Sequence, residues 1–426
     1  MRRHGSGGGR GGYVLLVATI SGLFGAASHR LWRLARAPPQ HQQVAPAAAA
    51  ARRVPPAPAQ LPAFGRPTAG DPRGRAGRAP LTHVGPRRRI RALGPWEAVS
   101  SDSRPTEFCE SSKAVYHDLV YVIGGFLCDF NRVTSAIQML NTTSGIWRTV
   151  AHLPPTAAKT HHGAAVSQDG TWLYLVSGQL GPGCTPGTAE SWAVRFVGKR
   201  QTKKTVWVRL PDLPEIRYAP SAYVDANALH IIGGAGPNRQ DPRSDHYALP
   251  LNPSGRPSKA GWFRVGTVPG GGADSAGSAV LRGRAFRFGG QHGHPPAVNV
   301  LYDNNVQCQA SPEVAHAQVY RRPLAQTSLE QGEAKGWAPV APLPWPASHI
   351  GLATLTVGDD VLVVSGKDGK RTTARIAAYD VISDAWREFR PLDWGQPDFL
   401  AYVSNDYLYA LKFKWHPVPW RRPPST

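Results

Sequence analysis

The chain has 426 residues and a formal net charge of +21, from 49 basic and 28 acidic side chains. So basic a composition is common among nucleic-acid-binding proteins, but the first 95 residues alone hold sixteen arginines and one acidic residue, Asp71, giving +15 and leaving +6 for the rest. Because this charge belongs to a low-complexity arm and not to a folded face, we expect no nucleic-acid partner.

An apolar stretch lies inside the arm. Residues 13–28 read YVLLVATISGLFGAAS, without a charge between Arg10 and Arg30. A membrane-spanning helix needs about 20 residues, and the flanking glycines and snorkelling side chains extend the stretch to that length in a thin bilayer. The sequence therefore predicts a short basic tail over 1–12 and a transmembrane signal anchor over 13–30. The small residues FGAAS leave a cleaved signal peptide open, and the Arg-rich, acid-poor composition leaves an organelle transit peptide open.

The segment 31–92 is rich in proline, alanine and arginine. It has too little apolar surface to bury for a stable fold, and proline-rich segments are extended, semi-rigid spacers. We therefore predict a disordered stem between a membrane and a globular head. The arginines are evenly divided between the two sides of the apolar stretch, so charge does not determine its orientation.

A repeated strand pattern begins after the stem. The runs LVYVIGG, WLYLVSG, ALHIIGG, AFRFGG and VLVVSG end at Gly125, Gly178, Gly234, Gly290 and Gly366, with spacings of 53, 56, 56 and 76 residues. Each run is followed by a second strand pattern and then by a tryptophan, at Trp147, Trp207, Trp262, Trp337 and Trp386. Most of these tryptophans precede a proline-bearing turn and a strand of small residues. The repeating unit is therefore four strands long.

Four antiparallel strands in units of about 50 residues resemble the blades of a kelch-type β-propeller. The fold class is thus all-β, and we predict six four-stranded blades over 93–415, followed by a C-terminal tail over 416–426. Trp96 would supply the outermost strand of the last blade, closing the ring with residues 407–413. Two repeats have Ser177 and Ser365 where the first glycine belongs, which we expect to be tolerated if these serines keep negative φ.

Two features would suit a lumenal propeller. Asn141 begins an N-glycosylation sequon, NTT, in a predicted turn. The four cysteines are Cys109, Cys128, Cys184 and Cys308. They allow three pairings, of which we favour Cys109 with Cys128, and four unpaired thiols stay an alternative.

The stretches SGQLGPGC, RYAPSAYVDANALHIIGGAGPNR, SDHYALPL and GGQHGH resemble a family of plant kelch-repeat proteins. That family has a galactose-oxidase-like central propeller and one N-terminal membrane-spanning segment. The resemblance runs from about residue 93 to 411. It implies a glycoprotein of Golgi or endosomal membranes whose propeller lies in the lumen, with another organelle or secretion as alternatives.

A copper-dependent oxidase of the galactose-oxidase kind would need tyrosine and histidine ligands at the propeller axis. His161, His162, His349 and Tyr218 lie near the starts of inner strands, but matching residue types do not make a ligand set. We therefore predict no enzyme, no metal and no cofactor. A soluble cytosolic adaptor for protein–protein interaction is the main alternative, although no helical module precedes the propeller.

The loops that follow the glycine stops are the candidate binding surface, because they leave one end of the blades and surround the channel. Two of them are long and polar. They offer Asn238, Arg239, Arg243 and Asp245 in one loop and Gln291, His292 and His294 in the other. Arginine pairs bidentately with carboxylates, so an acidic glycan or an acidic peptide is the expected ligand. The alternative is a pair of solvated loops with internal turn hydrogen bonds.

Overall fold

The structure is a computed structural model of the chain. It describes residues 90, 93, 96–98, 105, 108–127, 132–154, 157–181, 187–195, 205–225, 228–252, 255–258, 260–294, 312–324, 336–369, 371–393, 395, 400–404, 407–411 and 419–422. The predicted membrane segment over 13–30 lies outside these residues. Within the described part of the chain, no helix is long and apolar enough to span a membrane.

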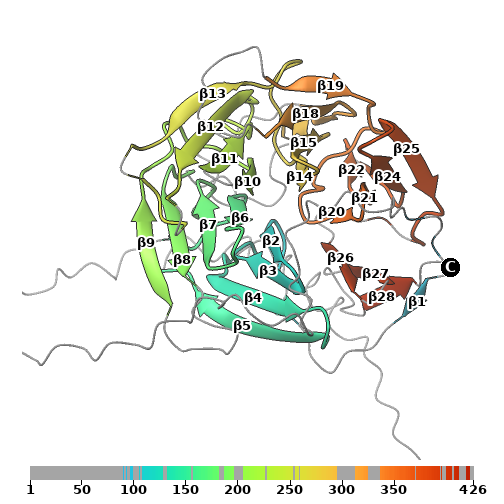
Figure 1. Cartoon of the computed structure of the whole chain (residues 1–426), viewed down its shortest axis with the longest axis horizontal. Coiled ribbons are helices and arrows are strands. Elements are labelled where there is room, and N and C mark those ends of the chain that lie inside the picture. Colours follow the sequence, from blue (N-terminus) through green and yellow to red (C-terminus); the bar gives the residue numbers. More distant parts are fainter. Residues whose placement is uncertain are drawn as a thin grey trace, which may run out of the picture. The chain divides into compact units, whose positions relative to one another are not determined.

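The described residues form six four-stranded antiparallel sheets, arranged as the blades of a propeller (Figure 1). Blade 1 consists of β2 (Ser112–Tyr116), β3 (Leu119–Ile123), β4 (Ala136–Asn141) and β5 (Ile146–His152); blade 2 of β6 (Gly163–Val166), β7 (Trp172–Val176), β8 (Ser191–Arg195) and β9 (Val206–Leu210). Blade 3 consists of β10 (Ser221–Val224), β11 (Ala228–Ile232), β12 (Asp245–Pro250) and β13 (Phe263–Thr267); blade 4 of β14 (Gly277–Leu281), β15 (Arg284–Phe288), β18 (Val319–Pro323) and β19 (Ala338–Val340).

Blade 5 consists of β20 (Thr354–Val357), β21 (Asp360–Val364), β24 (Ile376–Asp380) and β25 (Ala385–Phe389); blade 6 of β26 (Leu400–Ser404), β27 (Tyr407–Leu411), β28 (Pro419–Arg422) and β1 (Glu97–Ala98). Two short hairpins, β16 (Gln291–His292) with β17 (Val314–Ala315) and β22 (Lys367–Asp368) with β23 (Arg371–Thr372), extend from blades 4 and 5. The predicted propeller is therefore confirmed.

Blade 6 contains strands from both ends of the domain. β1 pairs with β28, with Glu97 opposite Arg421 and Ala98 opposite Trp420. This is the predicted closure next to Trp96, and it pairs an edge that would otherwise be open. β28 lies beyond residue 415, in the segment that the sequence assigned to a tail, so the propeller extends at least to Arg422. This stretch has four prolines and no alternating pattern that would predict a strand.

The second strand of blades 1 to 5 ends at the glycine stop, and its residues are buried on both faces because each blade packs between two others. In β7, β11 and β21 all five residues are buried. Neighbouring blades share apolar clusters. The cluster between blades 6 and 1 includes Phe108, Trp147 and Tyr402, which closes the ring of blades.

The glycine stops adopt positive φ and leave no room for a side chain. At Gly234, φ is +87°, and an added Cβ would lie 2.9 Å from the carbonyl oxygen of Tyr218. The expectation that Ser177 and Ser365 keep negative φ was wrong, because their φ angles are 56° and 63°. Hydrogen bonds offset this conformation: the Ser177 hydroxyl donates to the carbonyl oxygen of Thr188 at 2.7 Å, and the Ser365 hydroxyl to that of Thr373 at 2.8 Å.

Candidate functional site

The first strands of the six blades surround a central channel that contains a cavity of about 560 Å³. Two sets of equivalent side chains line it. The set nearer the strand starts is Lys113, Ala164, Ala222, Ser278, Thr354 and Ala401; the next is Val115, Val166, Val224, Val280, Thr356 and Val403. Few kinds of side chain therefore line the channel, and the polar ones lie mostly where the strands begin.

Five residues at that end occupy equivalent positions, just before the first strands. We call Glu110, His161, Ala219, Ser275 and His349 the mouth ring. All five have positive φ, of 51°, 50°, 48°, 53° and 54° in chain order. This conformation is unfavourable for residues other than glycine, and such backbone strain concentrates at functional sites.

Backbone hydrogen bonds join the mouth ring from blade to blade. The N–H of His161 donates to the carbonyl oxygen of Glu110 at 3.1 Å, and the N–H of Ala219 donates to that of His161 at 2.7 Å. The N–H of Ser275 in turn donates to the carbonyl oxygen of Ala219 at 3.0 Å. The positions of these side chains are thus fixed by the ring of blades and not by a flexible loop.

Glu110 lies between the two histidines of the ring. Its carboxylate is 3.0 Å from Nε2 of His161 and 3.7 Å from Nε2 of His349. A hydroxyl group faces the other nitrogen of each ring: Thr160 Oγ1 is 2.7 Å from His161 Nδ1, and Ser348 Oγ is 3.1 Å from His349 Nδ1. Burial lowers the pKa of both histidines, against the opposing effect of Glu110. At neutral pH two uncharged imidazoles therefore hold one partly exposed carboxylate.

A second group of side chains adjoins His161. Tyr218 stacks on the His161 ring at a centroid distance of 4.1 Å, and its hydroxyl accepts a hydrogen bond from Arg239 at 2.7 Å. The Arg239 guanidinium also lies over the Tyr218 ring, 4.3 Å from its centroid. His294 contacts the edge of Tyr218 and is 3.3 Å from the carboxylate of Asp274. Blades 3 and 4 thus contribute one cation and one carboxylate beside the mouth ring.

The structure separates the predicted binding residues. Arg239 and His294 lie beside the mouth ring, as described above. Gln291 is fully buried next to them, in backbone pairing with Asp274, and its amide nitrogen donates to the carbonyl oxygen of Gly293. These three residues from two loops are brought together, as the sequence predicted.

Arg243 and Asp245 belong to an ion-pair network elsewhere. The network centres on Arg217, whose side chain is 0% exposed. Arg217 pairs with Glu215 and, at 3.1 Å, with Asp245. Arg243 pairs with the same Glu215. The structure therefore does not place these two residues beside Arg239 and His294, and their assignment to a binding surface stays a prediction. The carboxylates of Glu215 and Asp245 stabilise the buried Arg217, and Arg243 is the second partner of Glu215.

Asn238 and His292 are also engaged locally. The Asn238 side chain accepts from the backbone N–H of Gln240 and donates to Asp241, which closes a turn of the solvated-loop kind. His292 Nδ1 is 3.0 Å from His316 Nε2, across the β16–β17 hairpin. Like Arg239, Gln291 and His294, these two residues do not line the cavity itself.

Sequence reasoning missed Glu110, Asp274 and Ser275. Glu110 and Ser275 lie just before the first strands of blades 1 and 4, and Asp274 forms a backbone bridge with Gln291. The signal that could have found them is positional: Glu110 and Ser275 stand at the place that His161 and His349 hold in their own repeats, and Asp274 stands one residue earlier, at the place of Thr160 and Ser348. Glu, His, Ala and Ser share no chemistry, so only an alignment of the repeats would reveal the position.

The four residues considered as copper ligands have different surroundings. His161, His162 and His349 line the channel cavity, whereas Tyr218 adjoins it by stacking on the His161 ring. His162 also packs between the glycine stops of blades 1 and 2, where an added Cβ on Gly178 would be 2.8 Å from its Cβ. Among the residues with described positions, no group of three or more His, Cys, Asp and Glu side chains is arranged to hold a metal ion. The hydroxyl of Thr160 belongs to a fully buried residue and could not reach a substrate.

Cys109 forms a disulfide bond and pairs through its backbone with Phe126. Cys128, Cys184 and Cys308 lie outside the described residues, so the Cys109–Cys128 pairing stays a prediction. Asn141 ends β4, and its side-chain oxygen accepts from the backbone N–H groups of Thr143 and Ser144 at 3.0 Å. The sequon thus occupies the predicted turn.

Comparison with known proteins agrees with this architecture. The chain is 27% identical over 324 residues to the Kelch repeat-containing protein At3g27220 of Arabidopsis thaliana, covering 74% of this chain and 70% of that protein. Among solved structures it resembles that of YjhT, with a TM-score of 0.54 and 13% identity over 75% of this chain and 95% of the other. No protein-family model matches the chain. The folded part of the chain is therefore a β-propeller, similar in sequence to a Kelch repeat-containing protein and in fold to YjhT.

Proposed function

We propose that the protein is a membrane-anchored binding module whose propeller lies in the lumen of the Golgi or of endosomes and binds an acidic glycan or acidic peptide at the channel mouth. The observation that carries this proposal is the mouth ring: five strained residues from five blades converge on one cavity. A cavity of about 560 Å³ is within the usual range for small-ligand sites. We propose no enzymatic activity.

The chemistry of the mouth supports a ligand that carries both a carboxylate and hydrogen-bonding groups. Arg239 is the cation that would pair with the ligand carboxylate. Its guanidinium is held in place by the stacking on Tyr218. Glu110 and the two histidines would accept and donate hydrogen bonds to hydroxyl or amide groups of the same ligand. Arg243 already forms an ion pair with Glu215. Of the two predicted arginines, Arg239 would therefore be the one that recognises the anion.

Three features support the lumenal position. The apolar segment 13–30 would anchor the chain, and the stem over 31–92 would space the propeller from the bilayer. The disulfide at Cys109 suits an oxidising compartment. Asn141 stands in a turn where glycosylation is sterically feasible.

The binding site is tested on arrays of anionic and neutral oligosaccharides and peptides with the full chain, its Arg239→Ala variant and its Arg243→Ala variant. We expect Arg239→Ala to lose retention of anionic ligands and to make the remainder less salt-dependent. Arg243→Ala is the matched control and should keep the wild-type profile. If Arg243→Ala loses binding while Arg239→Ala retains it, the mouth is not the site.

The soluble cytosolic adaptor is the second candidate. Protease digestion of sealed microsomes distinguishes it, because a lumenal propeller is protected until detergent is added. Digestion of the propeller without detergent, together with an Asn141 that carries no glycan, would remove the lumenal proposal and favour the adaptor.

A further inference from the structure

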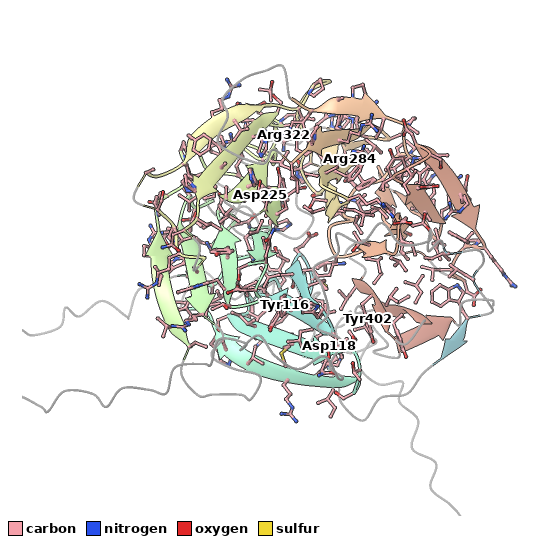
Figure 2. All side chains as sticks on the ribbon, in the orientation of Figure 1. Tyr116, Asp118, Asp225, Arg284, Arg322 and Tyr402 are labelled. Carbon is pink, nitrogen blue, oxygen red and sulfur yellow. The ribbon has the colours of Figure 1, made fainter. Side chains whose placement is uncertain are left out.

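A buried chain of polar side chains crosses the boundary between blade 3 and blade 4, away from the channel mouth. It begins at Asp225, which follows β10, and runs through His230 of β11 and His246 of β12 to Arg322 of β18. Figure 2 labels its two ends, Asp225 on blade 3 and Arg322 on blade 4. The two histidines are 1% and 0% exposed, so water does not satisfy their nitrogens.

Blade 4 fixes which nitrogen of His246 carries the proton. Nδ1 of His246 is 2.8 Å from Nη1 of Arg322 and 3.3 Å from Nε1 of Trp337. Both of these groups can only donate. His246 Nδ1 must therefore be an acceptor, and the single proton of the neutral ring must lie on Nε2.

The rest of the chain follows from that assignment. His246 Nε2 is 2.9 Å from His230 Nδ1, which must accept its proton; Tyr223 Oη is a more distant neighbour of Nε2 at 3.5 Å. The proton of the neutral His230 ring is then on Nε2, 3.0 Å from the carboxylate of Asp225. All hydrogen bonds point one way, from the arginine to the aspartate.

Such a chain has no place for an additional proton on either histidine. A proton on His246 Nδ1 would face the N–H groups of Arg322 and Trp337, beside a permanent positive charge. A proton on His230 Nδ1 would face the N–H of His246. The charged and titratable groups that contact the two rings are Asp225, Tyr223 and Arg322. Of these, only Asp225 would stabilise a protonated histidine.

We propose that this relay is an acid-operated clasp, which holds blades 3 and 4 together when both histidines are neutral and loosens their boundary when the opened state takes up protons. An opened boundary exposes the imidazoles, which then titrate near 6.5. The closed boundary excludes the proton until a lower pH, in agreement with the direction in which burial lowers the pKa of both rings. Above about pH 6.5 the two states hold equal numbers of protons; below it the opened state gains them and becomes more populated.

The boundary that the clasp holds also passes beside the proposed ligand site. The backbone N–H of His294 in blade 4 donates to the side chain of Gln240 in blade 3 at 3.1 Å, next to Arg239. Loosening the boundary would move these two halves of the mouth apart, so acid would release a bound ligand. This consequence rests on the proposed function, whereas the clasp itself does not.

The test is hydrogen exchange of the full chain, measured from pH 7.5 to 5.0 and corrected for the intrinsic pH dependence of amide exchange. We expect exchange in β12 and β18 to accelerate below about pH 6.5 by up to about tenfold per pH unit for each proton taken up. His246→Asn keeps an acceptor for Arg322 and cannot titrate, so its profile should be flatter by one proton. His292→Asn, in the partly exposed pair with His316, is the matched control and should keep the wild-type profile in these strands.

Superimposable profiles for the wild type and a folded His246→Asn variant would overturn the proposal. A second measurement covers the case in which that variant does not fold. Histidine-selective ¹⁵N labelling of the wild type should show His230 and His246 as neutral rings protonated at Nε2 at pH 7.5. An Nδ1-protonated or cationic His246 at that pH would equally overturn it. Neither measurement requires a ligand, so failure of the binding experiment leaves this result interpretable.

Discussion

The ammonium group of Lys113, on the first strand of blade 1, donates to the carbonyl oxygen of Leu352 in blade 5 at 2.6 Å. It also donates to the carbonyl oxygen of Thr354 at 3.0 Å and to that of Ala401, in blade 6, at 3.3 Å. One lysine side chain thus contacts three carbonyl oxygens across the seam at which the first and last blades meet, although burial lowers its pKa to about 7. This seam is where a propeller built from both chain ends would open first.

Lys113→Met should therefore destabilise the ring closure. Methionine fills a similar volume but leaves three carbonyl oxygens without their donor. Because burial lowers the pKa of Lys113 to about 7, part of the gain is lost to desolvation of the charge, and we expect a loss of roughly 1–3 kcal/mol in the free energy of unfolding. Urea denaturation measures it. Arg148→Met, on the exposed face of β5, is the control and should change stability by less than about 0.5 kcal/mol. Equal midpoints for both variants would show that the lysine does not hold the seam.

The tryptophans of the outer strands differ in burial, and this difference should appear in stability. Trp147 is 9% exposed and packs on Phe108, with ring centroids 6.3 Å apart, in the cluster between blades 6 and 1. Trp207 is only partly buried, against the cluster between blades 1 and 2. We expect Trp147→Ala to cost about 3–5 kcal/mol and Trp207→Ala clearly less. Denaturant unfolding of the two variants checks the order, and the reverse order would contradict the assigned packing.

Ser177 occupies the place of a glycine with a φ of 56° and depends on its hydroxyl. That hydroxyl donates to the carbonyl oxygen of Thr188 and accepts from the N–H of Arg217, both at 2.7 Å. Ser177→Ala keeps the unfavourable φ and loses both bonds, so we expect a cost of about 2–3 kcal/mol. Ser177→Gly loses the same bonds but relieves the backbone, and should cost less. Thermal unfolding of the pair tests this; an alanine variant as stable as the glycine variant would mean that φ is not strained.

The repeat, the blade architecture and the closure next to Trp96 could be predicted from the sequence because each repeat is a local pattern. Glycine stops and tryptophans recur at nearly constant spacing, and each follows from the backbone of a single blade. β28 could not be predicted, because its pairing depends on two partners from opposite ends of the domain.

The site was only half predictable. Arg239, Gln291 and His294 were found because loops after the glycine stops must lie at one end of the channel. The ion pair of Arg243 with Glu215 could not be predicted because nothing in the sequence marks Arg217 as buried, and a buried arginine draws nearby carboxylates and their partners into one network. The mouth ring was missed as a set because its members share a backbone position and no residue type.

The last prediction concerns the two histidines that share Glu110. Burial lowers the pKa of His161 and of His349 in the folded protein, whereas the unfolded chain titrates near 6.5. Above that pH both states are neutral and the contribution of the pair to stability is complete. As the pH falls below about 6.5, the unfolded chain binds protons that the folded protein does not, and the free energy of unfolding decreases by up to about 1.4 kcal/mol per pH unit for each histidine. Urea denaturation of the wild type at pH 7.5, 6.5, 5.5 and 4.5 should show this decrease. His349→Gln should have a shallower slope, whereas the exposed His152→Gln should retain the wild-type slope; a His349→Gln slope equal to that of the wild type would mean that this histidine takes up its proton in the folded state.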